Sequence, residues 1–320
     1  MKNLRESHRI TIAAAIVASY WYFACRQSRR KIPDVRNFSS VLQTACHRVG
    51  TELVFSRHAQ QETQQNNLPL VLVHGFGVSG SYFISFAECM AADRAVHIPD
   101  LPGHGYSTTP SHPLDINGLA QALVDWLDVM GLKRCVLLGQ SMGAQIAIEA
   151  AMRHEERFAG LILIGPTADP HAGLVRHAFR LLKVAPFERL SLFTILFRDY
   201  LRMGGRLIPE CGAMLRDPVA SKLERVHPPV LLLKGEYDAI VSDAWFYELR
   251  RGLGNPSELI IAGGGHAVQH SHPEEVAKAL KPFLNNLDEG GLEEDEIKKG
   301  HASPGVVEFT PDSVRSTSLS

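Results

Sequence analysis

Short apolar runs alternate along the chain with longer stretches in which apolar residues recur every three to four positions. The runs that we interpret as strands are residues 52–56, 68–73, 95–98, 135–138, 161–164, 230–233 and 258–261. The stretches with helical spacing are residues 119–130, 142–154, 243–251 and 273–285. This alternation is typical of an α/β protein in which helices cover both faces of a mostly parallel sheet.

One long interval interrupts the alternation. Residues 167–217 contain no strand-like run but two helix-patterned segments, one on each side of Pro186. An insertion of this length between strands predicts a helical cap. We expect it to cover the carboxyl ends of the strands, where ligands bind in open α/β sheets.

Both ends of the chain differ from its middle. Residues 10–25 are uncharged and apolar between basic flanks, and as a helix these 16 residues span about 24 Å, short of a hydrocarbon core of roughly 30 Å unless the flanks reach the interfaces. We interpret residues 1–31 as a membrane-anchor-like segment of a membrane-associated protein, in an orientation that the even flanking charges do not predict. A cleaved signal peptide, which implies secretion, and a soluble helix are the alternatives. Residues 288–320 are charged and rich in Gly, Ser and Thr, which predicts a disordered tail after a domain of residues 32–287.

Composition narrows the class of protein. The 320 residues include 33 Lys and Arg against 34 Asp and Glu, so the chain lacks the basic field on which nucleic-acid binding depends. The five cysteines are scattered without a CxxC pair, which indicates neither a zinc site nor a disulfide framework. We therefore expect no nucleic-acid partner and no metal.

The sharpest motif is GQSMG, residues 139–143, which lies between the strand-like run 135–138 and the helical pattern 142–154. A G-x-S-x-G sequence at a strand-to-helix turn is typical of a nucleophile elbow, with Ser141 at the turn. Gly139 and Gly143 lack the Cβ atoms that would clash where strand and helix pass closely. The alternative is an ordinary turn that happens to contain a serine.

A serine hydroxyl becomes a good nucleophile when a base removes its proton, and an acid must hold that base in the correct tautomer. His266 follows the last strand-like run and three glycines, so we predict it as the base. His270 and His272 are rivals that we expect to face solvent beside the last helix. Asp238, after the run 230–233, is the predicted acid, because the order serine, acid, histidine is the one expected of this motif.

Three further features belong to this prediction. Glu236 competes with Asp238, whereas Asp243 has the position of a helix start. The main-chain N–H groups of Phe76 and Met142 are the predicted donors to an oxyanion. We expect His74, beside Phe76, to be a structural hydrogen-bonding residue.

With these residues in place, the chain resembles the α/β-hydrolase superfamily over residues 41–287, within its serine esterase/lipase-like branch with a helical cap. The resemblance rests on VHGFG, DLPGHGYS, GQSMGA, KGEYDAIV and GGGH in the family's order. It implies an eight-stranded, mostly parallel sheet with helices on both faces, a cap inserted after strand six, and catalysis without cofactor or metal. It assigns a nucleophile, an acid, a base and two oxyanion donors, respectively Ser141, Asp238, His266, and Phe76 with Met142. His104 in DLPGHG is then structural or pocket-lining.

The chemistry implied is cleavage of a small-molecule ester or lipid-like substrate through an acyl-enzyme. A ligand-binding protein with little turnover, an acyltransferase and a cofactor-free peroxidase are the alternatives, since all fit the same residues. Residues 170–206 carry seven basic residues against two acidic ones, which favours a cap that faces a membrane or attracts anions. The cap's apolar residues either form a pocket roof or pack the cap onto the sheet: Phe179, Leu181, Leu182, Phe187, Leu192, Phe193, Ile195, Leu196 and Phe197.

Overall fold

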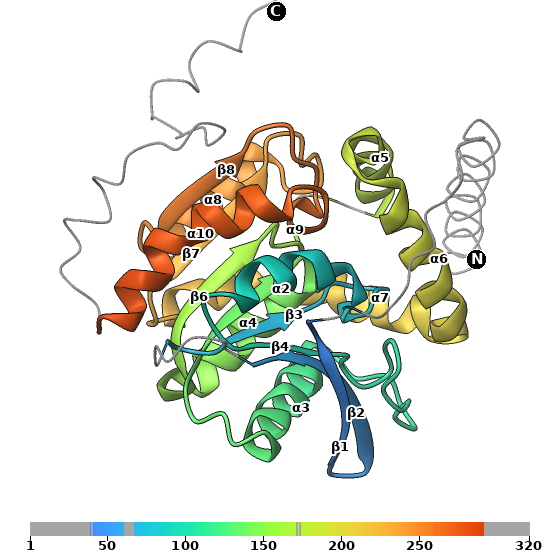
Figure 1. The fold of residues 1–320 in the computed structure, drawn as a ribbon. Helices are drawn as coiled ribbons and strands as arrows, with labels where there is room; N and C mark the ends of the chain where they lie inside the picture. The colour runs from blue at the N-terminus through green and yellow to red at the C-terminus, as the bar shows by residue number, and fades with distance from the viewer. Residues whose placement is uncertain (1–38, 40, 61–66, 171, 173, 291–320) are drawn as a thin grey trace, which may run out of the picture.

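The described residues of this computed structural model are 39, 41–60, 67–170, 172 and 174–290 (Figure 1). They contain an eight-stranded sheet with the order β1-β2-β4-β3-β5-β6-β7-β8. The strands are β1 (Gln43–Val49), β2 (Glu52–Ala59), β3 (Leu70–Val73), β4 (Val96–Pro99), β5 (Cys135–Gln140), β6 (Phe158–Ile164), β7 (Val230–Gly235) and β8 (Ser257–Ile261). Strand β2 runs antiparallel to β1 and β4, and the other neighbouring strands pair in parallel. The expected α/β-hydrolase sheet is confirmed.

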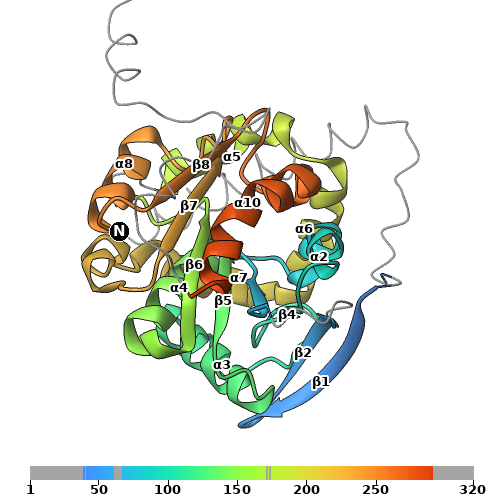
Figure 2. The same cartoon turned by 60° about the vertical axis from the view of Figure 1, so that its left-hand side comes forward.

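Alternate residues of the central strands pack into two separate hydrophobic clusters. Leu70 and Leu72 of β3 belong to one cluster, and Val71 and Val73 belong to the other. The first cluster includes side chains of α2 (Ile84–Ala91) and α10 (Pro273–Asp288); the second includes those of α3 (Ile116–Val129), α4 (Met142–Arg153) and α8 (Asp243–Gly252). Figures 1 and 2 show the resulting three layers, in which helices cover both faces of the sheet. Because both faces are covered, β3 and β5 are buried along their whole length.

Three longer helices fill the interval between β6 and β7. They are α5 (Leu174–Val184), α6 (Leu190–Met203) and α7 (Leu207–Arg216), and they lie inside the predicted cap of residues 167–217. Helix α6 buries Leu192 and Ile195, which join the same cluster as α2 and α10. The cap is therefore packed onto the core of the domain by one face of α6.

Several sequence-based predictions need correction. Strand β1 was not among the predicted runs, because as an edge strand it buries only its last residue fully and has a polar sequence. Helix α2 was also missed. The predicted tail, residues 288–320, begins too early, because Asp288 still belongs to α10. The carboxylate of Asp288 accepts from the N–H of Leu68 (2.8 Å) and pairs with Arg94 (2.9 Å).

The predicted anchor-like segment, residues 10–25, lies outside the described residues. Within the described part of the chain, no helix combines the length and apolar character that crossing a membrane requires.

Candidate active site

Ser141 lies at a sharp turn between the end of β5 and the start of α4. Its backbone angles, φ 57° and ψ −117°, are in a region that non-glycine residues rarely adopt and that costs about 1–3 kcal/mol. A Cβ atom on Gly139 would overlap the carbonyl of Gly143, and one on Gly143 would overlap the carbonyl of Val73. The two glycines thus allow β5, α4 and β3 to approach closely enough to hold Ser141 in this conformation.

Asp238 and His266 are in direct contact, one in the loop after β7 and the other in the loop after β8. The distance from Asp238 Oδ2 to His266 Nδ1 is 2.9 Å, and the carboxylate is fully buried. The other oxygen, Oδ1, accepts from the N–H groups of Ile240 (2.9 Å) and Val241 (3.2 Å). With Nδ1–H donated to the carboxylate, Nε2 is the ring nitrogen that can take up a proton.

The environment of His266 changes its basicity. Burial of the imidazole lowers its pKa, but the negative charges of Asp238 and Glu188 outweigh burial and raise the pKa above the ordinary 6.5. The side chain keeps 13% of its surface exposed, so the ring is accessible from one side. His266 is therefore a stronger base than a free histidine.

The residue before Ser141 ties the nucleophile strand to the His266 loop. Gln140 Nε2 donates to the carbonyl oxygen of His266 (3.0 Å), while its Oε1 accepts from the hydroxyl of Tyr82 (2.9 Å). The Tyr82 hydroxyl in turn accepts from the N–H of Gly75 (2.9 Å). A Cβ atom on Gly75 would lie 3.1 Å from the Cβ of Ser141. These bonds connect the loops that follow β3, β5 and β8.

The two predicted oxyanion donors lie beside this connection. Met142 is the first residue of α4, so no carbonyl of its own helix accepts its N–H. Phe76 lies between Gly75, which contacts Ser141, and Gly77, whose φ of 72° favours glycine. The ring of Tyr200, from α6, covers Gly77 so closely that a Cβ there would overlap it. The cap thus contacts the loop that carries one proposed donor.

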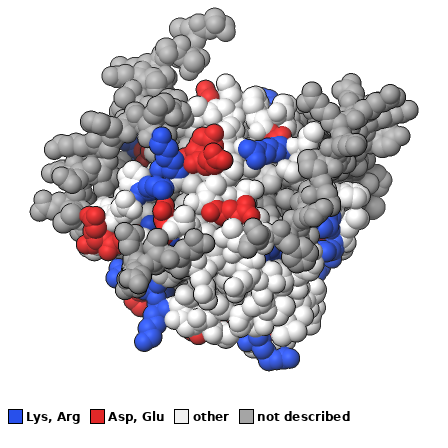
Figure 3. Space-filling view, viewed as in Figure 1, with Lys and Arg blue, Asp and Glu red and all other residues white. Residues whose placement is uncertain are grey.

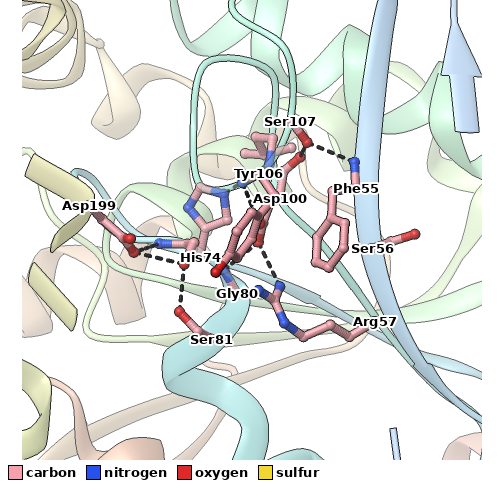
Figure 4. Close-up of polar contacts among 12 residues, drawn as sticks. Phe55, Ser56, Arg57, His74, Gly80, Ser81, Asp100, Tyr106, Ser107 and Asp199 are labelled. Carbon is pink, nitrogen blue, oxygen red and sulfur yellow. Dashed lines mark hydrogen bonds and ion pairs between the residues drawn. The ribbon is translucent and has the colours of Figure 1, made fainter. Parts of the chain in front are cut away.

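A buried polar network contacts the segment that follows Phe76 (Figure 4). Asp100 accepts from Arg57 (2.8 Å) and from the N–H groups of Gly80 (2.8 Å) and Tyr106 (3.0 Å). Asp199 of α6 accepts from both the N–H (2.8 Å) and the hydroxyl (2.7 Å) of Ser79. The segment after Phe76 is therefore held by one carboxylate from the core and one from the cap.

Three histidines that are not assigned to catalysis, His74, His104 and His270, have structural partners. His74 donates from Nδ1 to the carbonyl of Gly75 (2.9 Å), and its Nε2 accepts from the N–H of Leu101 (3.0 Å), as expected of a structural residue. The ring of His104 packs against that of His74, and burial lowers the pKa of His104 to about 4. The expectation that His270 faces solvent is wrong: it is buried, with Ser191 Oγ (2.9 Å) and the carbonyl of Tyr82 (3.0 Å) as its partners.

The competing acids lie elsewhere. Glu236 is exposed and accepts from the N–H of Gly263 (2.9 Å), so it stabilises a turn and does not contact the imidazole. Asp243 is the first residue of α8 and pairs with Lys234 (2.6 Å).

The sequence reasoning missed Glu188, which follows a short turn between α5 and α6. Its Oε1 accepts from the N–H of Ala267 (2.9 Å), next to His266. Its Oε2 is buried and has no hydrogen-bond partner among the residues that the structure describes. A Cβ on Gly265 would lie 2.6 Å from this carboxylate. A cap residue thus touches the loop of the candidate base. Within the described ranges, no group of three or more His, Cys, Asp or Glu side chains is arranged to hold a metal ion.

Comparison with known proteins places this geometry in a family. Residues 70–279 match the Alpha/beta hydrolase family. A (lyso)-N-acylphosphatidylethanolamine lipase of Mus musculus is 35% identical over 111 residues, which are 33% of this chain and 32% of that protein, so the chain spans only about a third of this relative's length. A pimeloyl-[acyl-carrier protein] methyl ester esterase of Xanthomonas axonopodis pv. citri (strain 306) is 28% identical over 247 residues, covering 68% of this chain and 95% of that esterase.

Solved structures share the fold. The crystal structure of a membrane phospholipase A, described as a bacterial virulence factor, aligns with a TM-score of 0.67 and 24% identity over 90% of this chain and 99% of its own. An esterase from Thermogutta terrifontis aligns with a TM-score of 0.62 and 21% identity over 77% of this chain and 99% of its own. Since the family match covers most of the described domain and includes Ser141, Asp238 and His266, this chain belongs to the alpha/beta hydrolase family.

Proposed function

We propose that this protein is a serine hydrolase that cleaves carboxylic esters through an acyl-enzyme on Ser141. The observation that carries the proposal is the 2.9 Å contact between Asp238 and His266. This pair lies at the same edge of the sheet as a serine in a strained strand-to-helix turn. That combination supports the roles of nucleophile for Ser141, base for His266 and orienting acid for Asp238.

The mechanism follows from the role of each group. Ser141 Oγ attacks the ester carbonyl while His266 Nε2 takes its proton, and the N–H groups of Phe76 and Met142 donate to the resulting oxyanion. The tetrahedral intermediate collapses as His266 returns the proton to the leaving alcohol. Water, deprotonated by the same imidazole, then releases the acid and regenerates Ser141. Asp238 orients the imidazole through Nδ1 and stabilises the imidazolium.

The substrate class that we propose is a lipid-like acyl ester. Support comes from relatives whose names include an N-acylphosphatidylethanolamine lipase and a methyl ester esterase. The apolar segment of residues 10–25, flanked by basic residues, supports association with a membrane, where such esters are found.

Hydrolysis of p-nitrophenyl esters of increasing acyl length tests both parts of the proposal. We expect turnover by the wild type, with preference for medium or long chains, and none by Ser141→Ala. Asp238→Asn should lower kcat by roughly 10⁴-fold, because the wrong tautomer of His266 would be held.

The same panel distinguishes the alternatives. Undiminished hydrolysis by Ser141→Ala would refute the assignment of the nucleophile, and activity confined to acetate would refute the lipid-like substrate. No turnover of any ester by folded protein would favour a ligand-binding role, and product esters formed with added alcohols in preference to free acid would favour an acyltransferase.

A further inference from the structure

We propose that the outer surface of the cap docks on a lipid surface with anionic headgroups. By the cap outer surface we mean exposed apolar and basic side chains of α5 to α7 and the turn between α5 and α6: Phe179, Lys183, Arg189, Leu190, Leu201, Arg202 and Ile208. The docking proposal does not depend on the proposed ester hydrolysis. Delivery of a membrane lipid from this surface to the active site would follow from docking, and that step does rest on the proposed ester hydrolysis.

Helix α6 is apolar on two opposite sides. Leu192 and Ile195 are buried, at 6% and 2% exposure, and pack the helix onto the core. Leu190 and Leu201, eleven positions apart and therefore only about 20° apart around the helix axis at 100° per residue, are 59% and 68% exposed. A surface helix of a protein surrounded by water normally carries polar residues on that side. On this side of α6, leucines are exposed to solvent instead.

The exposure of large apolar residues is concentrated in the cap. Of the fourteen large hydrophobic residues that are exposed in the described chain, eight fall between Phe179 and Ile208. Phe179 of α5 and Ile208 of α7 are 63% and 65% exposed. Isolated exposed apolar residues are ordinary, but a concentration in one inserted segment indicates a surface that binds something.

The charges of the cap indicate what it binds. Residues 174–216 contain eight Lys or Arg and only three acids. Two acids are turned inward, because Asp199 and Glu210 are 2% and 3% exposed, and the third, Glu188, is bonded to the His266 loop. In Figure 3, Lys and Arg side chains are seen at the right-hand side of the molecule, where Figure 1 draws α6 and α7. Arg180, Arg198 and Arg206 pair with buried acids, whereas Lys183, Arg189 and Arg202 are exposed, so the outward charge of the cap is positive.

Exposed leucine and phenylalanine interleaved with Lys and Arg match the interface of an anionic membrane. The apolar groups can enter the acyl boundary while the long basic side chains reach the headgroups. A two-fold contact with a second copy of the chain would instead bring this positively charged surface against itself, and the like charges would oppose that contact. The charge pattern therefore favours a lipid surface over a second copy of the chain.

Tryptophan fluorescence in the full-length chain tests this contact separately from any anchoring by residues 10–25. In a Trp21→Phe background the remaining tryptophans, Trp126 and Trp245, are buried at 1% and 0% exposure. Leu201→Trp then reports on the cap. Val129→Trp is the matched control, because Val129 is 48% exposed at the end of α3, which leads to the amino end of β5, away from the cap.

The probe is a vesicle of phosphatidylcholine, with or without phosphatidylglycerol, that contains brominated acyl chains. We expect strong quenching of the tryptophan at position 201 in anionic vesicles and none at position 129. Lys183→Glu with Arg189→Glu should weaken the contact of the cap with anionic vesicles by about fivefold or more per reversed charge, measured as loss of quenching at position 201, and leave quenching in neutral vesicles unchanged.

Three results would overturn the proposal. The first is vesicle-bound protein in which the tryptophan at position 201 is quenched no more than the one at position 129. The second is a tryptophan at position 201 that is shielded from a soluble quencher even without vesicles. Another segment of the chain or a second copy would then cover the cap, and sedimentation would distinguish these two cases. The third is quenching at position 201 in anionic vesicles that the charge reversals do not weaken.

Discussion

Two carboxylates from different parts of the chain control the proton affinity of His266. Burial alone lowers the pKa of the imidazole, but Asp238 beside it and Glu188 on the cap raise it, with a net increase above 6.5. The imidazole acts as a base only when it is neutral, and it becomes protonated as the pH falls below its pKa. Hydrolysis should therefore decline on acidification with a midpoint above pH 6.5.

Glu188→Gln should move that midpoint to lower pH. The amide oxygen can still accept from the N–H of Ala267, but the negative charge that stabilises the imidazolium is lost. The measurement is kcat/KM between pH 5 and pH 9, which reports on the free enzyme. Glu236→Gln is the matched control, because it changes a carboxylate that accepts an N–H of the same loop but does not raise the pKa of His266. Equal shifts in the two variants, or none in Glu188→Gln, would contradict the role of the cap charge.

The sequence predicted residues whose signal is local and missed those whose role depends on contacts between distant segments. Ser141 and His266 each follow a strand-like run with adjacent glycines, so both stand out from the chain. Gln140 occupies a variable position of the motif, and nothing near Glu188 indicates that it meets Ala267, 79 positions later. His270 was assigned wrongly for the same reason, because its partners come from other elements.

Helix α6 contacts the loop that carries Phe76, one of the two predicted oxyanion donors. Asp199 accepts two hydrogen bonds from Ser79, and its neighbour Arg198 donates to the hydroxyl of Ser81 (2.6 Å). Tyr200, next along the helix, covers Gly77. Three consecutive residues of the cap therefore contact the segment that follows Phe76.

Asp199→Ala should destabilise the protein and slow catalysis. The change leaves the N–H of Ser79 without its acceptor and removes the buried partner of Arg198, at a cost of about 3 kcal/mol in the free energy of unfolding. Urea denaturation measures that loss, and kcat should fall more than KM rises because the loop that carries Phe76 is released. The exposed Glu224→Ala is the control, expected within about 0.5 kcal/mol of wild type. If Asp199→Ala proved as mild as this control, α6 would not be a support of the loop.

Strands and helices that are largely buried were easier to predict from the sequence than those that are mostly exposed. The central strands read as apolar runs because both faces are covered, and α3, α4, α8 and α10 have periodic apolar sides. Strand β1 pairs only with β2 and is mostly exposed, so its sequence carries no comparable signal. Of the three helices of the cap, α5 and α6 match the two helix-patterned segments predicted on either side of Pro186. Helix α7 was not predicted; it buries Glu210 and no apolar residue, so it lacks an apolar side.

The whole domain brings its catalytic candidates together because parallel strands place their carboxyl ends at one edge. Loops after β3, β5, β7 and β8 supply Phe76, Ser141, Asp238 and His266. Contacts of Asp288, the last residue of α10, also join the end of the domain to the segment before β3: its carboxylate pairs with Arg94 and accepts from the N–H of Leu68. These contacts were not predictable, because the charged sequence after residue 288 resembles a tail.

Site-resolved labelling with a fluorophosphonate asks whether this fold makes one serine reactive. Mass spectrometry of the folded wild-type chain should find a single adduct, on Ser141. The adduct should be absent from Ser141→Ala and from wild type unfolded in urea, and much reduced in His266→Gln, because the reactivity comes from the assembled site. A folded protein with no adduct, or with its adduct on another serine, would contradict the assignment of Ser141 as the nucleophile.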